Sequence, residues 1–314
     1  MAAEGLTTRA RDAVTVAAFK GAWWGVRALP ERAAHRLFDV IADVTTRRGG
    51  PSVARMRSNY AIARPELDDA ALDALVAAGV RSYLRYWCEA FRLPSLTREQ
   101  IAERVSTSGE LEATRSMLAD GRSVVAYLGH LGNWDLAGAW SATQLAHVTT
   151  VAERLEPDAL FRAFLHFREE LGMTIIPLTK GENVLGQVET LVREPGAFAP
   201  LLSDRDLTSR GVTVDLCGEP ARLAAGPAVI ARRTGAALVP ITITYRRRDG
   251  GSGWGIDIRF HPAVDIAHTD DARADVQAAV QACADALGGA IREHTQDWHM
   301  MQRVFVRDLD ARWG

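Results

Sequence analysis

After Gly121 the chain alternates between short apolar runs and segments of helical periodicity, and this alternation constrains the fold more than any other feature. Apolar runs such as 123–128 (SVVAYL) are typical of buried strands. Parallel strands need a long crossover connection, usually a helix, so this pattern predicts an α/β fold with a mostly parallel central sheet and helices on both faces. The expected strands are 123–128, 148–152, 174–178, 197–202, 212–216, 237–245 and 255–260, and the expected helices are 134–146, 158–171, 183–192, 227–234 and 272–294.

The chain before this alternation, from about residue 9 to 93, has helical periodicity and no strand pattern. We therefore predict an N-terminal helical extension at 1–93 and an α/β core at 94–314 that forms one globular unit. A glycine-rich stretch at 249–253 (DGGSG) predicts a hairpin turn between the last two strands.

The first helix of the extension has an unusual mixture of side chains. Phe19, Trp23 and Trp24 lie beside Lys20 and Arg27 in the sequence, a combination that suits the boundary between water and lipid. The same aromatic residues would equally suit a helix packed on the rest of the protein. Both interpretations remain open, and the first makes the region at 1–93 a candidate membrane-facing surface.

Charge and cysteine content exclude several classes of protein. The 37 basic and 39 acidic side chains leave a formal net charge of -2, which argues against general nucleic-acid binding. Cys88, Cys217 and Cys283 are far apart, which disfavours a disulfide framework or a thiolate zinc site. We find no apolar stretch suited to a signal peptide or a membrane-spanning helix, so we expect a protein of a reducing compartment.

Ligands of open parallel sheets bind beyond the carboxyl ends of the strands, so the residues that follow each expected strand are the candidates for a site. One strand is followed by 129–135 (GHLGNWD), which contains His130 and Asp135. Another is followed by Glu153, and a third by 203–206 (SDRD) with Asp204 and Asp206. A histidine beside carboxylates at one edge of a sheet is the arrangement that general-base chemistry requires.

Two carboxylates are candidates for orienting His130. Gly129 and Gly132 predict a tight turn between strand and helix, with Asn133 as the cap of the helix that follows. Asp135 would lie in the first turn of that helix, from which its carboxylate could reach one ring nitrogen. Asp204 sits at a neighbouring strand end and could take the same role. The plainer interpretation of the motif is a capped helix with a surface histidine.

A different class of enzyme also fits part of the sequence. Asp204 and Asp206 form an Asp-x-Asp pair, which a metal-dependent glycosyltransferase would use to hold a divalent ion and a sugar nucleotide. The alternative is a solvated loop whose acids pair with Arg154 or Arg168. Sequence signatures of the nucleophile elbow, the P-loop, the dinucleotide fold and the zinc proteases are absent.

Several sequence segments resemble those of a known family and occur in the same order. They are 129–135 (GHLGNWD), Glu153-Arg154, 167–172 (FREELG), 202–206 (LSDRD), 211–221, 226–240 and 294–298 (HTQDW), which together span roughly residues 120 to 305. This pattern resembles the bacterial lipid acyltransferases of the lauroyl/myristoyl lipid A type. Only Lys20 and Lys180 are lysines, and this arginine bias is typical of a GC-rich bacterial genome. Within the superfamily, the chain most resembles the actinobacterial phosphatidylinositol mannoside acyltransferases.

The resemblance implies transfer of a long fatty acyl group from acyl-CoA to a mannose hydroxyl of a phosphatidylinositol mannoside, without a cofactor or a metal. It makes His130 the general base, with Asp204, Asp135 or both as its partners, and backbone donors near the turn as the oxyanion site. Glu153, Arg168, Arg205 and Asp206 would bind substrate, with Arg168 paired to a local carboxylate and Arg205 near a phosphate.

The implied lipid acceptor also suggests where the enzyme acts, and the family suggests an alternative acceptor. An enzyme with a lipid acceptor and no spanning helix is expected to bind peripherally to the cytoplasmic face of the cell membrane. It would also need a hydrophobic groove for the acyl chain, which no spacing in the sequence locates. The alternative activity is acyl transfer to lipid A.

Overall fold

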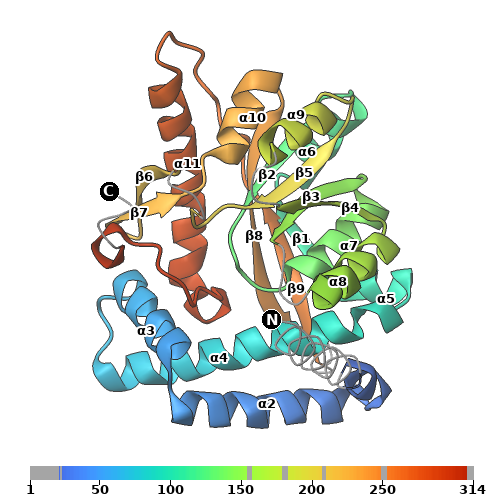
Figure 1. The fold of residues 1–314 in the computed structure, drawn as a ribbon, viewed down its shortest axis with the longest axis vertical. Helices are drawn as coiled ribbons and strands as arrows, with labels where there is room; N and C mark the ends of the chain where they lie inside the picture. Colours follow the sequence, from blue (N-terminus) through green and yellow to red (C-terminus); the bar gives the residue numbers. More distant parts are fainter. Residues whose placement is uncertain are drawn as a thin grey trace, which may run out of the picture.

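The structure is a computed structural model that describes residues 21, 23–153, 158–178, 183–206, 210–248 and 253–309. Over these residues, a seven-stranded central sheet has the strand order β1-β9-β8-β2-β5-β3-β4 (Figure 1). Each pair of neighbours is parallel except the β8–β9 pair. The prediction of a mostly parallel sheet is therefore confirmed. The strands are β1 (Val105–Gly109), β2 (Val124–Leu128), β3 (Val148–Glu153), β4 (Met173–Leu178), β5 (Phe198–Leu202), β8 (Ala237–Arg247) and β9 (Trp254–Phe260).

Helices cover both faces of the sheet, as the alternating side chains of β2 show. Val125 and Tyr127 belong to an apolar cluster shared with the helices α9, α10 and α11, while Val124 and Ala126 belong to one shared with α7 and α8. Successive side chains of a strand point to opposite faces, so a strand buried on both sides is continuously apolar. The helices are α2 (Glu31–Arg48), α3 (Pro51–Ala63), α4 (Asp69–Arg92), α5 (Arg98–Glu103), α6 (Leu111–Ala119), α7 (Trp134–Gln144), α8 (Asp158–Glu170), α9 (Val184–Val192), α10 (Gly226–Thr234) and α11 (Ala272–Glu293).

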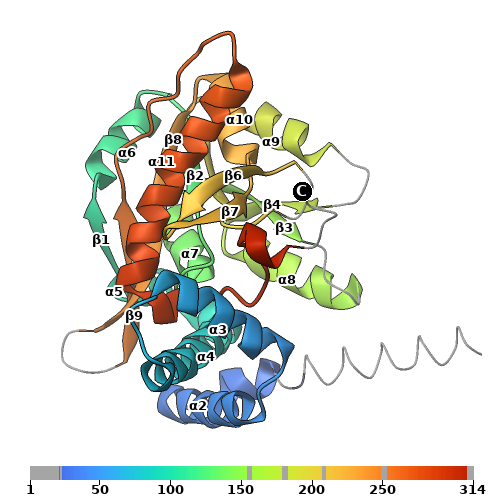
Figure 2. The same cartoon turned by 90° about the vertical axis from the view of Figure 1, so that its left-hand side faces the viewer.

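The structure differs from the expected element order in several places, since α5, β1, α6 and β7 were not predicted. The expected strand at 212–216 does not join the central sheet: as β6 (Val212–Leu216) it pairs with β7 (Glu219–Leu223) in a separate antiparallel ribbon against α11 (Figure 2). The edge strand β1 was not predicted, because its sequence VSTSG is polar and its side chains are only partly buried. An edge strand has only one neighbouring strand and can be polar. The periodicity of apolar residues therefore does not indicate it.

The described part of the N-terminal extension is helical, as predicted. Asp68 caps the start of α4, because its side chain accepts a hydrogen bond from the Ala71 amide. The helix α2 packs on α4 through Ala34 and Phe38. In Figure 1, α2 lies outermost, with α4 between it and the sheet. In the described part of the chain, we find no helix with the length and apolarity that crossing a membrane requires.

The helix with the aromatic residues is only partly described, since residues 1–20 and 22 lie outside the described residues. Of the turn expected at 249–253, residues 249–252 also lie outside them. Trp23 packs inward: its Nε1 donates a hydrogen bond to the Phe91 carbonyl (2.8 Å), and its ring contacts Phe167. Trp24 is 74% exposed. The three cysteines are buried and free, which confirms that no disulfide joins them.

Candidate active site

The register of two central strands brings His130 and Asp204 together. The strands β2 and β5 are parallel neighbours, and their last residues, Leu128 and Leu202, are direct partners. His130 lies two residues after Leu128, and Asp204 lies two residues after Leu202. Because the two strand ends are paired, His130 and Asp204 are neighbours at this edge of the sheet. The convergence expected at this edge of the sheet is therefore present for these two residues.

Asp204 is fully buried and holds His130 at two points. Its Oδ1 lies 2.5 Å from Nδ1 of the imidazole, and its Oδ2 accepts the backbone amide of His130 at 2.9 Å. The same Oδ2 accepts the indole N–H of Trp298 at 2.9 Å. Burial alone would raise the pKa of Asp204, but the charge of His130 and the donated hydrogen bonds outweigh it and lower the pKa. The carboxylate therefore stays ionised beside the ring.

This contact determines what the other ring nitrogen can do. A carboxylate on Nδ1 favours the tautomer that carries its proton there, which leaves the lone pair of Nε2 for a substrate. The His130 side chain keeps 18% of its surface exposed, and the edge of its ring meets Trp134, with the centroids 5.5 Å apart. The imidazole is thus oriented, accessible at one side and able to accept a proton from a hydroxyl group.

Asp135 does not orient the imidazole. Its Oδ1 accepts a hydrogen bond from Arg168 Nε at 2.8 Å, and its Oδ2 accepts the Tyr86 hydroxyl at 2.8 Å. The first turn of α7 turns this carboxylate towards α4 and α8, which supply those two donors, and away from the ring. The sequence-based expectation that Asp135 could reach the ring is corrected here, and the orienting carboxylate is Asp204.

The Tyr86–Asp135–Arg168 network is buried and polar. Burial acts to lower the pKa of Arg168, but the Asp135 carboxylate outweighs it, and the pKa rises above its usual value. Burial and the same carboxylate raise the pKa of Tyr86. The Tyr86 ring lies against Trp134, with the centroids 4.1 Å apart, so this network supports the residue that contacts His130. A role for Arg168 in substrate binding stays a prediction.

The turn between β2 and α7 has the form that the glycines predicted. Gly132 has a φ of 58°, and a Cβ there would lie 2.6 Å from the Ile243 carbonyl, so only glycine fits. Asn133 caps α7 through the Leu136 amide (2.9 Å), as expected, and its amide also donates to Glu89 (2.9 Å).

Three successive amides of this turn donate to acceptors within the protein. The amide of His130 donates to Asp204, that of Leu131 to the Gly129 carbonyl, and that of Gly132 to the Asp297 carbonyl. Three successive donors are therefore already engaged by the protein. An oxyanion site formed by other backbone amides near the turn stays a prediction.

Arg205 and Asp206 have hydrogen-bond or ion-pair partners other than the imidazole. Arg205 donates to the Gln302 side chain, and Asp206 Oδ2 accepts the Gly211 amide at 2.7 Å and lies 3.7 Å from Arg222. Asp206 thus pairs with Arg222 instead of with Arg168. Glu153 ends β3, but its side chain, like all of Arg154, lies outside the described part of the structure.

The Asp-x-Asp pair does not have the form of a metal site. Asp204 faces His130 and Trp298, whereas Asp206 faces Gly211 and Arg222. Across the described residues, no three metal-binding side chains gather in one place. The arrangement gives the glycosyltransferase hypothesis no support.

Sequence reasoning missed the second histidine of this region. The His299 ring lies among Tyr83, Tyr86 and Trp134, its backbone amide donates to the His130 carbonyl at 2.8 Å, and its Nε2 lies 3.1 Å from Ser82 Oγ. Burial lowers its pKa to about 3. It follows the HTQDW block by one residue, but neither spacing nor periodicity indicates that α4 and the C-terminal segment meet at the site.

The family is shown by comparison with known proteins. A family model of bacterial lipid A biosynthesis acyltransferases matches residues 7–307. The chain belongs to this family. As a member of the lipid A acyltransferase family it is an acyltransferase, and the resemblance inferred from the ordered blocks is confirmed.

Two curated relatives of this acyltransferase cover nearly all of it. The phosphatidylinositol mannoside acyltransferase of Mycobacterium tuberculosis is 39% identical over 293 residues, which are 93% of this chain and 89% of the relative. The phosphatidylinositol mannoside acyltransferase of Mycolicibacterium smegmatis is 38% identical over 296 residues, which are 94% of this chain and 93% of that relative. The similarity therefore includes both the helical extension and the core.

Proposed function

We propose that this acyltransferase transfers a long fatty acyl group from acyl-CoA to a mannose hydroxyl of a phosphatidylinositol mannoside, with His130 as the general base. The observation that carries the mechanism is the 2.5 Å contact between His130 Nδ1 and Asp204 Oδ1, which leaves Nε2 for the substrate. The names of the two relatives support the acceptor, because they are similar over almost the whole chain.

The proposed reaction is a balanced acyl transfer. Nε2 of His130 takes the proton of the mannose hydroxyl while the hydroxyl oxygen attacks the thioester carbonyl carbon. Collapse of the tetrahedral intermediate breaks the carbon–sulfur bond, and the imidazolium returns its proton to the departing thiolate. The products are the acylated glycolipid and the CoA thiol. Asp204 stabilises the imidazolium between these steps, so its charge contributes most when the ring is protonated.

The outer face of α2 supports binding at a membrane surface. Leu37, Val40, Ile41 and Val44 form an exposed apolar stripe along this helix, with exposed fractions of 44%, 60%, 41% and 37%. The spacing of three, one and three residues places all four on one side of a helix. We propose that this stripe, together with the exposed Trp24, contacts the cytoplasmic leaflet of the cell membrane.

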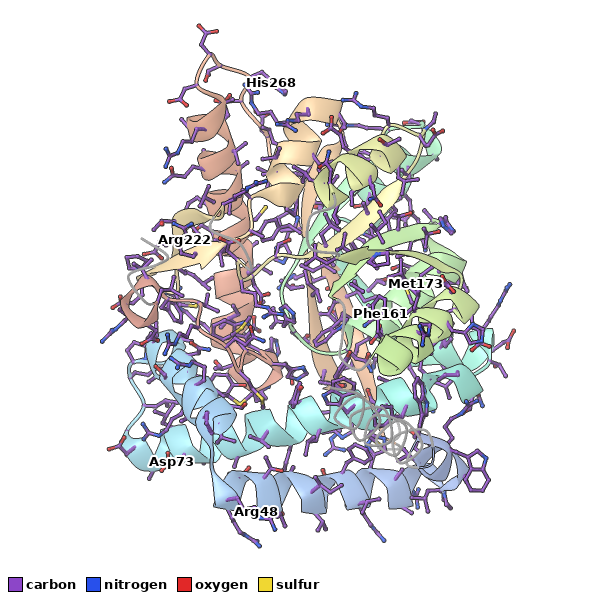
Figure 3. All side chains as sticks on the ribbon, in the orientation of Figure 1. Arg48, Asp73, Phe161, Met173, Arg222 and His268 are labelled. Atoms are coloured by element: carbon purple, nitrogen blue, oxygen red, sulfur yellow. The ribbon has the colours of Figure 1, made fainter. Side chains whose placement is uncertain are left out.

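Arginines accompany the apolar stripe. Arg32 and Arg36 precede it on α2, Arg47 and Arg48 follow it, and all four are exposed; Arg48 is labelled at the end of the helix in Figure 3. Basic side chains around an apolar stripe suit an anionic lipid surface. The binding proposed here is peripheral.

The experiment combines two donors with two acceptors. The purified protein is mixed with acyl-CoA or an acyl carrier protein thioester, and with vesicles that contain phosphatidylinositol mannoside or a glucosamine-based lipid A precursor. We expect release of CoA only with the first donor and the first acceptor. Transfer to the lipid A precursor alone would establish the alternative activity. Free thiol and acylated lipid are both measured.

A matched pair of histidine variants tests the mechanism. His130→Ala should lose transfer, whereas His147→Ala should keep it, because His147 is exposed and contacts Thr174 at another part of the sheet. Full turnover by the His130→Ala protein would remove the proposed general base.

A further inference from the structure

The HTQDW block at 294–298 ends on a tryptophan that has no role in the chemistry described above. Trp298 is fully buried, and its Nε1 donates a hydrogen bond to Oδ2 of Asp204 at 2.9 Å. A buried indole N–H needs one acceptor, which a backbone carbonyl can provide. Here the acceptor is instead the carboxylate that orients the proposed general base.

Three donors reach the Asp204 carboxylate in the described structure, and two of them belong to His130. Oδ1 faces Nδ1 of the imidazole, whereas Oδ2 accepts both the His130 amide and the indole N–H. Each oxygen of an ionised carboxylate has two lone pairs, so these two donors occupy Oδ2. Among the described residues, Trp298 is therefore the donor that acts on this carboxylate independently of the histidine.

The position of Trp298 is fixed by segments from both ends of the chain. Its amide donates to the Thr295 carbonyl at 3.1 Å, its carbonyl accepts the Tyr60 hydroxyl at 2.8 Å, and it pairs with Leu131 in an isolated β-bridge. Tyr60, on α3, is also fully buried and passes α4 at Gly79, where a Cβ would collide with the tyrosine ring. The fold itself thus holds the indole N–H against the carboxylate.

A hydrogen-bond donor aimed at a carboxylate stabilises the negative charge and weakens the hold on a proton. Burial acts to raise the pKa of Asp204, and the indole N–H is among the donors, after His130, that lower it. The charge of Asp204 in turn stabilises a proton on the ring, so a donor on Asp204 also lowers the proton affinity of the histidine–aspartate pair. An imidazolium cannot act as a base, so the indole N–H favours the useful state.

Charged or titratable residues lie on the elements around the pair: Tyr127 on β2, Cys283 on α11, Arg205 and Asp206 after β5, Asp135 on α7, Arg168 on α8 and His299 in the C-terminal segment. Burial raises the pKa of Tyr127 and that of Cys283, and it lowers the pKa of His299 to about 3. Asp206 is paired with Arg222, and Asp135 with Arg168. Arg205 keeps its proton. None of these residues is expected to change its charge near neutral pH, so a titration observed there at His130 belongs to the pair.

We propose that Trp298 is a positioning residue of the acyl transfer, whose indole N–H acts through Asp204 to keep His130 neutral and protonated at Nδ1. In that state Nε2 can take the proton of the acceptor hydroxyl. This role rests on His130 being the general base in the proposed function.

A histidine titration tests the role without any turnover. The whole protein is labelled with 15N-histidine, and the His130 signals among its eight histidines are identified by their absence from the spectrum of His130→Ala. We expect the midpoint of the His130 titration to rise by at least about half a pH unit in Trp298→Phe, because the N–H donor is removed. An unchanged or lower midpoint would overturn the proposal.

Two controls separate the indole N–H from packing. Trp140→Phe makes the same change at another buried tryptophan, on α7, and Tyr60→Phe removes the hydrogen bond to the Trp298 carbonyl but leaves the indole in place. Both should keep the native midpoint within about 0.2 pH units, since neither change removes a donor from Asp204. A control that shifts the midpoint as much as Trp298→Phe does would contradict the role.

A second variant covers the case in which Trp298→Phe does not fold, as urea unfolding would show. Replacement of the Trp298 indole by benzothiophene keeps the shape of the ring and lacks the N–H. The same rise in the His130 midpoint is expected, and the same absence of a rise would overturn the proposal.

Kinetics then link the indole to transfer. The kcat/KM of the native protein should fall at low pH as His130 takes up a proton, and in Trp298→Phe this fall should begin at higher pH. A shift of about half a unit makes the loss about threefold larger in the acid limb than on the alkaline plateau. A loss equal at all pH values would indicate a structural effect and contradict the role.

The histidine variant distinguishes the two levels of the inference. Full turnover by His130→Ala would refute the proposed function and with it this role. An inactive His130→Ala protein beside an unshifted titration in Trp298→Phe would refute the role of Trp298 alone.

Discussion

Nδ1 of His130 lies 2.5 Å from Oδ1 of Asp204, a carboxylate whose side chain has no exposed surface. The contact exists because the two residues each stand two positions beyond paired strand ends. It assigns the orienting role to a residue 74 positions away in the sequence instead of to Asp135, five positions away.

Asp204→Asn should abolish most of the activity without changing the shape of the site. An amide cannot stabilise the imidazolium as a carboxylate does, and it favours the wrong tautomer of the ring. We expect kcat to fall by about 10² to 10⁴ and KM to change little. Steady-state kinetics with thiol detection measures both. Asp257→Asn is the control, because Asp257 lies on β9 and accepts hydrogen bonds from Ser106 and Ser108 of β1. Equal losses in the two variants would contradict the assignment.

Arg168→Met should destabilise the fold strongly. The substitution leaves the Asp135 carboxylate buried, with an exposed fraction of 3%, and removes its charged partner. Loss of one member of a buried ion pair costs about 3 to 5 kcal/mol. Urea unfolding measures the change, with Arg193→Met as the exposed control, for which we expect less than about 1 kcal/mol. The double variant Asp135→Asn/Arg168→Met should recover part of the loss; strict additivity would argue against coupling between the two residues.

Stability should fall on acidification because of His299. Burial lowers the pKa of this histidine to about 3 in the folded protein, whereas an unfolded histidine titrates near its usual value of about 6.5. Between these values the unfolded chain binds a proton that the folded chain does not, so unfolding is favoured as the pH falls below about 6.5. The slope for one such group approaches about 1.4 kcal/mol per pH unit.

Comparison with His299→Phe isolates this contribution. The variant keeps an aromatic ring among Tyr83, Tyr86 and Trp134 but cannot titrate, so its stability should decline less between pH 6.5 and pH 4. His35 and His261, whose pKa values are also lowered by burial, are present in both proteins and cancel in the difference. Identical pH slopes in urea unfolding would show that His299 is not the group responsible.

The double variant V40D/I41D should bind vesicles more weakly. It places two charges in the exposed apolar stripe of α2, where burial of one such side chain in lipid would contribute about 1.5 to 3 kcal/mol. We expect the vesicle partition coefficient to fall at least about tenfold, measured by co-sedimentation with anionic vesicles. Val306→Asp is the control, because Val306 is 40% exposed but does not lie on α2. A similar loss in the control would mean that the stripe is not the membrane contact.

The buried strands and the turn glycines were predictable, and some edge elements were not. The run 123–128 is apolar because β2 is covered on both faces, and Gly132 is required by a positive φ against the Ile243 carbonyl. The edge strand β1 and the hairpin strand β7 have mixed polar sequences, because each is only partly buried. The strand at 212–216 was predicted, but its sequence could not show which sheet it joins.

Patterns along the chain were enough to predict the α/β class, the family and His130 as the histidine of the site. Those features depend on local periodicity and on ordered blocks of residues, which a linear chain displays directly. Which acid contacts His130 became clear only from the tertiary structure. The register of β2 and β5 places Asp204 beside the ring, and the orientation of α7 points Asp135 away from it.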